Sequence, residues 1–123
     1  MNPRNAKDPR IVGAFGEYTA ARMLREEGYD IFSKNFATPV GELDLVAFKK
    51  GVLCFVEVKT RRTNGMYRPA DAVDFRKEEN IKSAAASYIN KYKLNYKVRF
   101  DIIEVYIDEN GNVVDKQHII NAF

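Results

Sequence analysis

The chain has 123 residues, of which 46% are hydrophobic and 30% charged, and its formal net charge is +3. This length supports one domain with a single core, so we assign residues 1–123 to one domain and residues 1–7 to a flexible basic tail. No apolar run approaches the roughly 20 residues that span a bilayer, and the first residues lack the apolar core of a signal peptide. We therefore expect a cytoplasmic protein with no membrane partner.

The first predicted element is a helix over Pro9–Glu27. Asp8 is a favourable N-cap, Pro9 suits the first helical position, and Gly28 is a typical stop. Residues that recur at three- and four-residue spacing share one face: Gly13, Glu17, Ala20, Ala21 and Leu24. A carboxylate on this small, apolar face needs a partner. Glu17 either bonds an arginine or a backbone group at the rim of the sheet, or it is a third acid of a functional site near Asp44 and Glu57.

A strand over Tyr29–Asn35 and a turn-prone connection over Phe36–Val40 lead into the hairpin Gly41–Arg62. If Lys50-Gly51 forms a two-residue loop, Val46 faces Phe55, and Asp44 lies directly opposite Glu57. The same register places Glu42 opposite Lys59, so we expect those two to pair. Both faces of the hairpin are largely apolar, which indicates the buried centre of a sheet.

The facing carboxylates of Asp44 and Glu57 are the unusual feature of this hairpin. At about 4 Å they repel by roughly 1 kcal/mol in water and by about 4 kcal/mol at an effective dielectric constant of 20. A hard cation such as Mg²⁺, which takes oxygen ligands, would offset this repulsion. Lys59, two residues after Glu57, points to the same side and can hold a water or a phosphate oxygen. The alternative is an ordinary pair of charges at the wet end of a hairpin, and the strand pattern alone leaves both open.

The hairpin continues into a basic loop, Thr60–Ala70. Arg61, Arg62 and Arg68 leave the strand beside the two acids, where they suit contacts with a phosphate backbone. Tyr67 either stacks on a base or packs on its own loop. Neither alternative is excluded by the sequence.

The remaining elements are a helix, capped by Asp74, to about Tyr92, then the strand Lys97–Ile107 and a return strand over Val113–Ile120. Asn110-Gly111 predicts a type I′ turn between the two strands. The polar return strand suits a sheet edge. The expected order is α-β-β-β-α-β-β.

The chain has one cysteine and one histidine. A lone Cys54 excludes an intrachain disulfide and a cysteine zinc cluster, and its place within an apolar strand predicts a core side chain. His118 is predicted as an edge-strand side chain, because the sequence shows no pattern of acids or serine that would complete a site around it.

Asp44 followed by Glu57-Val58-Lys59 fits the D…(D/E)-x-K signature of the PD-(D/E)XK, or restriction-endonuclease-like, nuclease superfamily. The segments GELDLVAF and LCFVEVKTR resemble the YraN-like family, which is similar to archaeal Holliday-junction resolvases. The resemblance is specific over residues 13–62 and looser through the next helix and strand. Leu43, rather than proline, precedes Asp44.

The resemblance implies an α/β fold with a restriction-endonuclease-like core, in which helices flank a mixed central sheet. It implies a Mg²⁺- or Mn²⁺-dependent endonuclease that hydrolyses the DNA backbone, including branched or junction DNA. The residues implied are Asp44, Glu57 and Lys59 for catalysis, Glu17, Asp44, Glu57 and the backbone carbonyl of Val58 for the metal, and Arg61, Arg62, Arg68 and Lys77 for DNA.

Two other functions are consistent with the sequence: a non-catalytic nucleic-acid-binding module that retains the nuclease fold, and an interaction domain with no nucleic acid. The intact set of Asp44, Glu57 and Lys59 favours the nuclease. Cutting two strands symmetrically requires two sites, so we expect a homodimer. Its interface would be the Val113–Ile120 edge or an apolar patch of Ile119, Ile120 and Phe123, unless Phe123 folds back over its own sheet.

Overall fold

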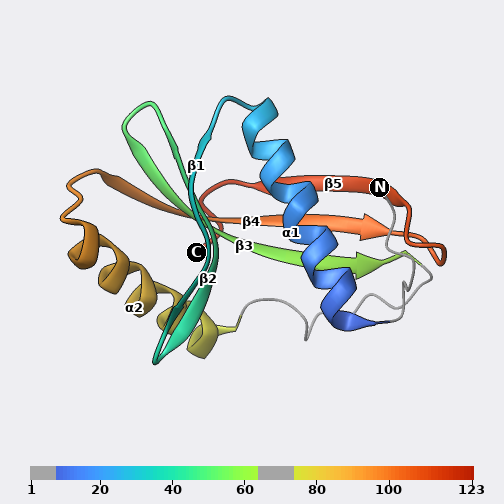
Figure 1. Cartoon of the computed structure of the whole chain (residues 1–123), viewed down its shortest axis with the longest axis horizontal. Coiled ribbons are helices and arrows are strands. Elements are labelled where there is room, and N and C mark those ends of the chain that lie inside the picture. The colour runs from blue at the N-terminus through green and yellow to red at the C-terminus, as the bar shows by residue number, and fades with distance from the viewer. Residues whose placement is uncertain (1–7, 64–73) are drawn as a thin grey trace.

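The computed structural model describes residues 8–63 and 74–123, which form a five-stranded sheet with two helices (Figure 1). The elements are α1 (Pro9–Glu26), β1 (Asp30–Thr38), β2 (Gly41–Lys49), β3 (Val52–Arg62), α2 (Phe75–Tyr92), β4 (Lys97–Ile107) and β5 (Val113–Ile119). Their order is the predicted α-β-β-β-α-β-β. The expected fold class, a mixed sheet flanked by helices, is confirmed.

The strands lie across the sheet in chain order, β1-β2-β3-β4-β5. Every neighbouring pair is antiparallel except β3 and β4, which are parallel and are joined by a crossover that contains α2. Parallel neighbours require such a crossover, whereas antiparallel neighbours need only a short turn. The two edges of the sheet are therefore β1 and β5.

The β2–β3 hairpin has the predicted register. Val46 pairs with Phe55, and Phe48 pairs with Leu53. Lys50 and Gly51 have φ values of 50° and 81°, and positive φ at both central residues is what a type I′ turn requires. The loop thus fixes which residues of the two strands face each other.

β2 and β3 separate after the pair Leu45–Val56 (Figure 1). β2 goes on pairing with β1 as far as Gly41, whereas β3 goes on along β4 to Arg62. The sheet therefore divides into two arms. We call this point the fork, defined by Asp44 on β2 and Glu57 on β3, the residues next to the last pair.

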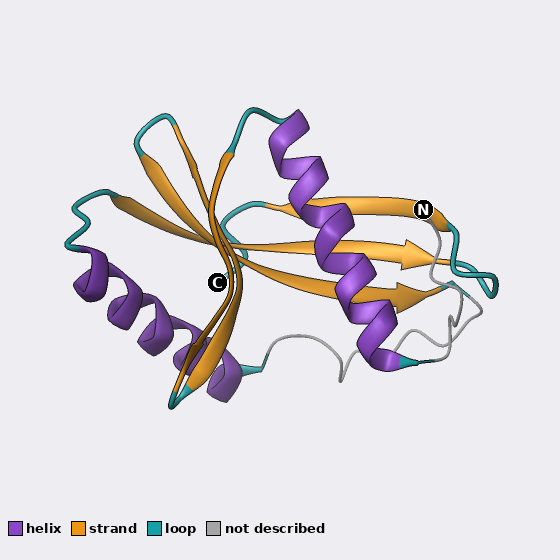
Figure 2. Cartoon of the chain, in the orientation of Figure 1, coloured by secondary structure: helices purple, strands orange, loops and turns teal. Residues whose placement is uncertain are grey.

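Two apolar cores lie on opposite faces of the sheet, each covered by one helix (Figure 2). The core under α1 includes Cys54, which is fully buried as predicted. Helix α1 buries Phe15, Gly16, Ala20, Ala21 and Leu24. The predicted face is confirmed for its last three members, whereas a Cβ on Gly13 would meet no atom within 4 Å.

Both helices begin at the predicted caps. The Asp8 carboxylate accepts the N–H of Arg10 at 3.0 Å, and the Asp74 carboxylate accepts the N–H of Lys77 at 2.8 Å. α1 ends at Glu26, one residue earlier than predicted. Within residues 8–63 and 74–123, neither helix is both long and apolar enough to cross a membrane.

Strand β1 is longer than the predicted Tyr29–Asn35, because residues assigned to a turn find partners on β2. Phe36 pairs with Leu43, and Thr38 pairs with Gly41. The Thr38 hydroxyl also donates to the Gly41 carbonyl at 2.7 Å. Only residues 39 and 40 remain between the two strands.

The predicted type I′ turn at Asn110-Gly111 is wrong. Only Gly111 has a positive φ, 81°. The Asp108 carboxylate instead accepts the N–H groups of Asn110 and Asn112, each at 2.9 Å. Because this side chain satisfies the loop backbone, residues 108–112 form a wider turn in place of a two-residue loop.

A buried charged network joins β4, β5 and the end of α1. Fully buried Asp101 accepts from Arg99 Nε at 2.9 Å and lies 2.7 Å from His118 Nε2, and His118 Nδ1 lies 2.9 Å from Glu27. Burial favours neutral forms of both Asp101 and His118. The hydrogen bonds and opposite charges outweigh it, so they lower the pKa of Asp101 to about 2 and raise the pKa of His118. His118 lies on the edge strand as predicted, but its side chain is buried between two acids.

The C-terminus folds back over its own sheet. Phe123 stacks on Phe100 with ring centroids 5.3 Å apart, and it packs against the core under α2. Ile119 and Ile120 stay 38% and 56% exposed. Phe123 is thus part of the fold, whereas the two isoleucines leave apolar surface at the β5 edge.

Candidate active site

The fork brings together the two acids that the hairpin register predicts. The Asp44 carboxylate accepts the N–H of Val58 at 2.9 Å. A side chain of β2 thereby bonds the β3 backbone just beyond the last pair of residues in the ladder. Glu57 is only 7% exposed. Where the strands separate, the β3 backbone is therefore bonded to the Asp44 carboxylate, and the Glu57 carboxylate next to Val58 is buried.

The electrostatics of the fork disfavour two negative charges. Burial raises the pKa of Asp44, and the charge of Glu57 raises it further. The hydrogen bond from the Val58 N–H only partly opposes these effects, so the pKa of Asp44 reaches about 7. The charge of Glu17 adds to the same effect. The fork is therefore a place where positive charge, or a proton, is favoured.

Two lysines supply positive charge to the same oxygen of Glu57. Lys77 Nζ lies 2.8 Å from Glu57 Oε1, and Lys59 Nζ lies 3.6 Å from it. Burial and the neighbouring Lys77 lower the pKa of Lys59, whereas the bond to Glu57 outweighs burial and raises the pKa of Lys77. Glu42, the partner predicted for Lys59, is exposed, and in the described part of the chain the ion pair of Lys59 is with Glu57.

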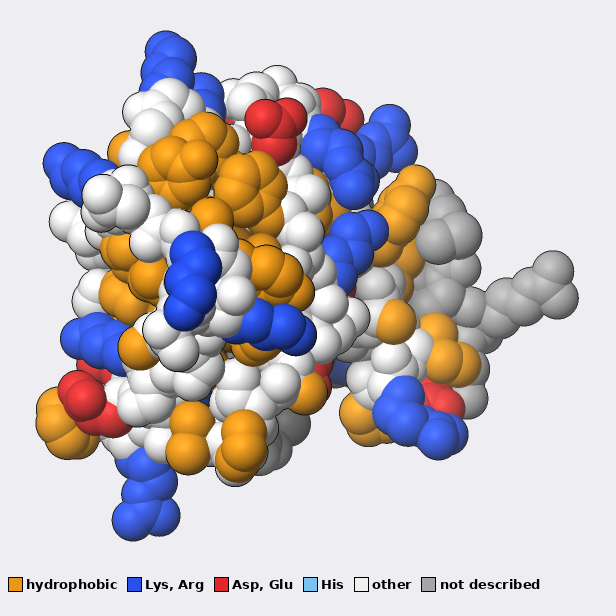
Figure 3. Space-filling model, turned by 60° about the vertical axis from the view of Figure 1, so that its left-hand side comes forward, with side chains coloured by type: hydrophobic (Ala, Val, Ile, Leu, Met, Phe, Trp, Pro, Cys, Tyr) orange, Lys and Arg blue, Asp and Glu red, His pale blue; other side chains and the backbone are white. Residues whose placement is uncertain are grey.

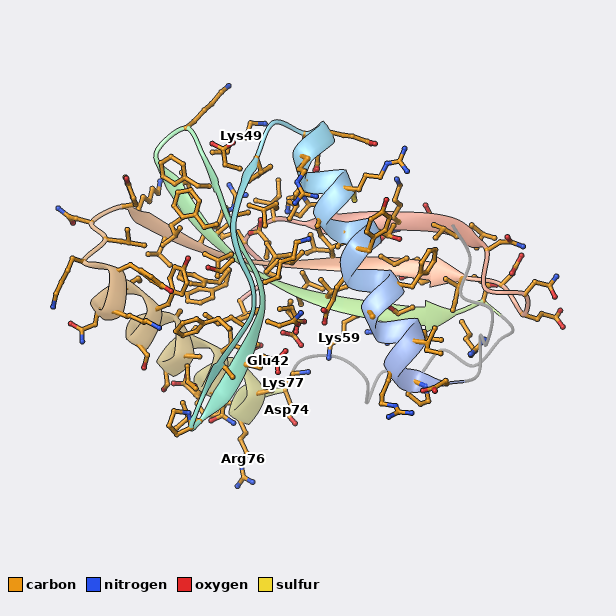
Figure 4. The ribbon with its side chains drawn as sticks, in the orientation of Figure 1. Glu42, Lys49, Lys59, Asp74, Arg76 and Lys77 are labelled. Carbon is orange, nitrogen blue, oxygen red and sulfur yellow. The ribbon has the colours of Figure 1, made fainter. Side chains whose placement is uncertain are left out.

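Figure 4 shows the arrangement: Lys59 and Lys77 lie close together in the opening between β2 and β3, with Glu42 close by. Arg76, the residue before Lys77, points away from the sheet. Helix α2 thus directs Lys77 into the fork, because its N-cap at Asp74 sets where its first turn begins.

Glu17 approaches the fork from α1. Burial raises its pKa, a hydrogen bond from the Asn35 side chain opposes this, and the charges of Glu42 and Glu57 raise it further. The helix can come this near because residue 16 is glycine: a Cβ there would lie 1.9 Å from Thr60 Oγ1 on β3. Glu17 therefore belongs to the electrostatic environment of the two fork acids.

Asn35 is a site residue that the sequence did not indicate. Its neighbours Lys34 and Phe36 pair with Leu45 and Leu43, which places Asn35 opposite Asp44. Its φ is 52°, in the left-handed region that asparagine tolerates better than most residues. Its amide reaches Glu17. In the sequence Asn35 only marks the expected end of a strand, and the β1–β2 register alone reveals its place.

The three arginines predicted for DNA backbone contacts differ in their surroundings. The side chain of Arg61 is 10% exposed and pairs with Glu104 on β4 at 2.5 Å. Arg62 is half-buried at the end of β3. Arg68, like Tyr67, lies outside the described residues. Their contacts with phosphate stay a prediction.

The donor set fits a hard divalent cation that keeps much of its water. In residues 8–63 and 74–123, no three His, Cys, Asp or Glu side chains are grouped so as to hold a metal ion. Mg²⁺ is usually bound through one or two carboxylates, with waters and substrate phosphates completing its shell. Asp44 and Glu57 supply such a pair, and a cation between them would relieve the repulsion that raises the pKa of Asp44.

The sequence profile of the Uncharacterised protein family UPF0102 matches residues 16–105. This chain belongs to the UPF0102 family. It is similar to UPF0102 proteins of Caldanaerobacter subterraneus subsp. tengcongensis, 44% identical over 93% of this chain and 95% of the relative, and of Acetivibrio thermocellus, 40% identical over 97% and 95%. The UPF0102 protein of Dictyoglomus thermophilum is 39% identical over 91% and 96%. The UPF0102 profile runs from Gly16 on α1 to Val105 on β4, so it includes the fork, Glu17, Asn35 and Lys77.

Proposed function

We propose that this UPF0102 protein is a metal-dependent nuclease of the PD-(D/E)XK type that hydrolyses the phosphodiester backbone of DNA. The observation that carries the proposal is that Asp44 and Glu57 meet at the fork and that Lys59 forms an ion pair with Glu57. The D…(D/E)-x-K signature and the resemblance to archaeal Holliday-junction resolvases support it. They also favour branched DNA as the substrate.

In this proposal Asp44, Glu57 and the backbone carbonyl of Val58 hold Mg²⁺ or Mn²⁺, and Glu17 adds negative charge behind them. When bound, the ion neutralises phosphate charge and makes a water more acidic. Lys59 orients the attacking water and stabilises negative charge that develops on the phosphate. Its lowered pKa, caused by burial and by Lys77, suits a group that exchanges a proton with that water.

Lys77 has a different part in the proposed site. Its side chain is 45% exposed, against 18% for Lys59, although both form ion pairs with the same Glu57 oxygen. We assign Lys77 to a DNA phosphate. When a cation binds Glu57, Lys77 would leave Glu57 and pair with that phosphate. The basis of this assignment is that Lys77 is both close to the fork acids and exposed to solvent.

A second candidate is a nucleic-acid-binding module without catalysis. It is favoured by the ion pairs of Glu57 with Lys59 and Lys77, which neutralise this acid without any cation. Such a module would bind DNA in the absence of divalent ions and never cut it.

The experiment that separates the two is a cleavage assay with end-labelled Holliday junctions, flaps, duplexes and single strands, each with Mn²⁺, Mg²⁺ or EDTA. The nuclease proposal expects Mn²⁺-dependent cutting that Asp44→Ala abolishes and that Glu109→Ala, at an exposed acid in the β4–β5 loop, leaves intact. Calorimetric titration with Mn²⁺ should show binding that Asp44→Ala and Glu57→Ala remove without unfolding the domain. Tight DNA binding with no cutting of any substrate would establish the binding module instead.

A further inference from the structure

Exposed aromatic side chains gather where β1, the β2–β3 hairpin and the end of α2 meet. Phe32 stacks on Phe48 with ring centroids 5.2 Å apart, and Phe48 lies 4.5 Å from Tyr96. Phe32, Tyr92 and Tyr96 are 41%, 47% and 45% exposed. We call Phe32, Phe48, Tyr92 and Tyr96 the aromatic face.

The chain exposes Phe32 through an irregularity in β1. Pairing shifts between Ile31–Ala47 and Ser33–Val46, so Phe32 is an extra residue in a β-bulge. Bulges redirect side chains. Between Phe32 and Tyr92 lies an open groove of about 520 Å³. The hydroxyls of Ser33 and Tyr88, which line this groove, are hydrogen-bonded at 2.8 Å.

Lysines adjoin the tyrosines of the aromatic face. From Asn80 to Phe100 the chain contains no Asp or Glu, and Lys91, Lys93 and Lys97 are next to Tyr92 and Tyr96 in the chain. One exposed acid, Asp30 on β1, pairs with Phe48. Lys91 Nζ lies 5.4 Å from the centre of the Tyr92 ring. Figure 3 shows hydrophobic side chains interleaved with Lys and Arg on this side of the molecule.

We propose that the aromatic face binds an unpaired strand of nucleic acid, with bases stacked on its rings and phosphates paired with its lysines. Aromatic platforms flanked by cations are how proteins hold single strands without sequence preference, because every base has a π-face. A purely apolar partner would gain nothing from the lysines, whereas a phosphate backbone complements them.

This inference deepens the proposed function, because it adds a second contact for the substrate of the fork. Lys77 and Tyr92 are fifteen positions apart along α2, about 22 Å at 1.5 Å per residue. At the roughly 3.4 Å per nucleotide of a helically stacked strand, about six nucleotides span that distance, and an extended strand needs fewer. A branched substrate with a single-stranded arm of this length would reach both places.

The test is fluorescence anisotropy of the full chain with a labelled oligothymidylate of about 20 nucleotides, in EDTA, so that no cleavage occurs. Tyr92→Ala should weaken binding by about fivefold or more, and Tyr96→Ala should do the same. Tyr92→Phe should bind like the wild type, and Tyr92→Leu should bind like Tyr92→Ala. The matched control is Tyr18→Ala on α1, since Tyr18 is also 47% exposed, and it should leave the affinity unchanged.

Three outcomes would overturn the inference. One is equal affinity of wild type, Tyr92→Ala and Tyr96→Ala for the oligonucleotide. Another is Tyr92→Leu binding as well as the wild type, which would indicate apolar contact without stacking. The third is a concentration-dependent self-association, seen by sedimentation, that Tyr92→Ala abolishes while oligonucleotide binding persists, which would assign the face to a second copy of the chain. Because the binding assay runs in EDTA, oligonucleotide binding is read without any cleavage, so a wild type that binds the oligonucleotide but cuts nothing with Mn²⁺ would count against the nuclease proposal alone.

Discussion

Lys59 and Lys77 contact the same oxygen of Glu57, yet their environments predict different effects of removing them. Lys59→Ala should reduce Mn²⁺-dependent cleavage by about 10² to 10³, the usual cost of losing a group that stabilises developing charge. Metal binding should remain within about twofold, because Lys59 is not a ligand. The measurement is turnover on the preferred substrate together with a Mn²⁺ titration.

Lys77→Ala serves as the comparison for Lys59. We expect it to weaken DNA binding more than it lowers the maximal rate. Unchanged turnover in Lys59→Ala would remove that lysine from the mechanism.

A substitution at Asn35 tests whether its side chain controls the pKa of Glu17. Asn35→Gly keeps the positive φ, which glycine adopts freely, but removes the amide that lowers the pKa of Glu17. The pKa of the Glu17 carboxyl should therefore rise, as measured by carbon-13 NMR titration. Lys50→Gly, at another positive-φ residue, should leave that pKa unchanged. If the pKa of Glu17 were the same in wild type and Asn35→Gly, Asn35 would have no positioning role.

At the scale of elements, the approach of α1 to β3 depends on Gly16. Gly16→Ala would place a Cβ against Thr60 Oγ1 and push the helix outward, at a cost of about 1–3 kcal/mol in the free energy of unfolding. Gly13→Ala, on the same helix with open space around it, should instead stabilise by roughly 0.5–1 kcal/mol. Urea denaturation measures both.

A double variant checks the cause of the Gly16 effect. Thr60→Ala removes the hydroxyl that a Cβ at residue 16 would meet, so Gly16→Ala/Thr60→Ala should regain most of the lost stability. Equal destabilisation by Gly16→Ala with and without Thr60 would show that the close contact is not the reason.

The two hairpins illustrate what local sequence can predict. At Lys50-Gly51 the two-residue loop forms as predicted, so the register and the meeting of Asp44 with Glu57 follow from the sequence. At Asn110-Gly111 a favourable dipeptide loses to the carboxylate of Asp108, which bonds two backbone N–H groups of the same loop. Turn residues are decisive only where no neighbouring side chain competes for the backbone.

The rest of the candidate site depends on contacts between distant segments. Lys77 reaches Glu57 through the crossover and the start of α2, whereas the residues alone favour an ordinary solvated lysine and only the family resemblance implies a role at the site. Asn35 faces Asp44 only because β1 extends to Thr38 and pairs with β2. Such placements follow from tertiary packing, which local patterns do not encode.

At the scale of the whole molecule, the buried network around His118 makes stability depend on pH. Its neighbours are Glu27 and Asp101, which bond its two nitrogens, with Arg99 on Asp101 and the Tyr29 ring at its edge. Because the pKa of His118 is raised above 6.5, its contribution is complete below pH 6.5 and is lost as pH rises through the folded-state pKa. Asp101, with a pKa of about 2, loses its contribution only as pH falls from about 4 towards 2.

His118→Gln should therefore lower the free energy of unfolding by about 1–3 kcal/mol between pH 4 and 6.5, with a smaller difference at higher pH. Thermal unfolding from pH 4 to 9 measures this. Lys116→Gln, at an exposed residue of the same strand, should show no such dependence. A difference that grew with pH would contradict the assignment of a charged His118.

The exposed β5 edge predicts that two copies of the chain associate through it. Val114 and Ile120 are 54% and 56% exposed there, and an exposed apolar edge favours pairing with another copy. We expect a homodimer in sedimentation at micromolar concentration, and Val114→Lys/Ile120→Lys should make it monomeric. Phe75→Lys, at a 74% exposed residue of α2, should leave the dimer intact. A wild-type monomer that still nicks one strand would refute the dimer.

The fork also constrains how the chain length can vary among relatives. Asp44 and Glu57 are held opposite each other by a hairpin whose strands alternate their side chains between two faces. Adding one residue to each strand would keep the acids opposite each other but turn both away from Lys77, and only a second residue on each strand would turn them back. Unless a bulge intervenes, insertions into the strands between the two acids are therefore expected in steps of four residues, whereas the loops at residues 50–51 and 108–112 are free of this restriction.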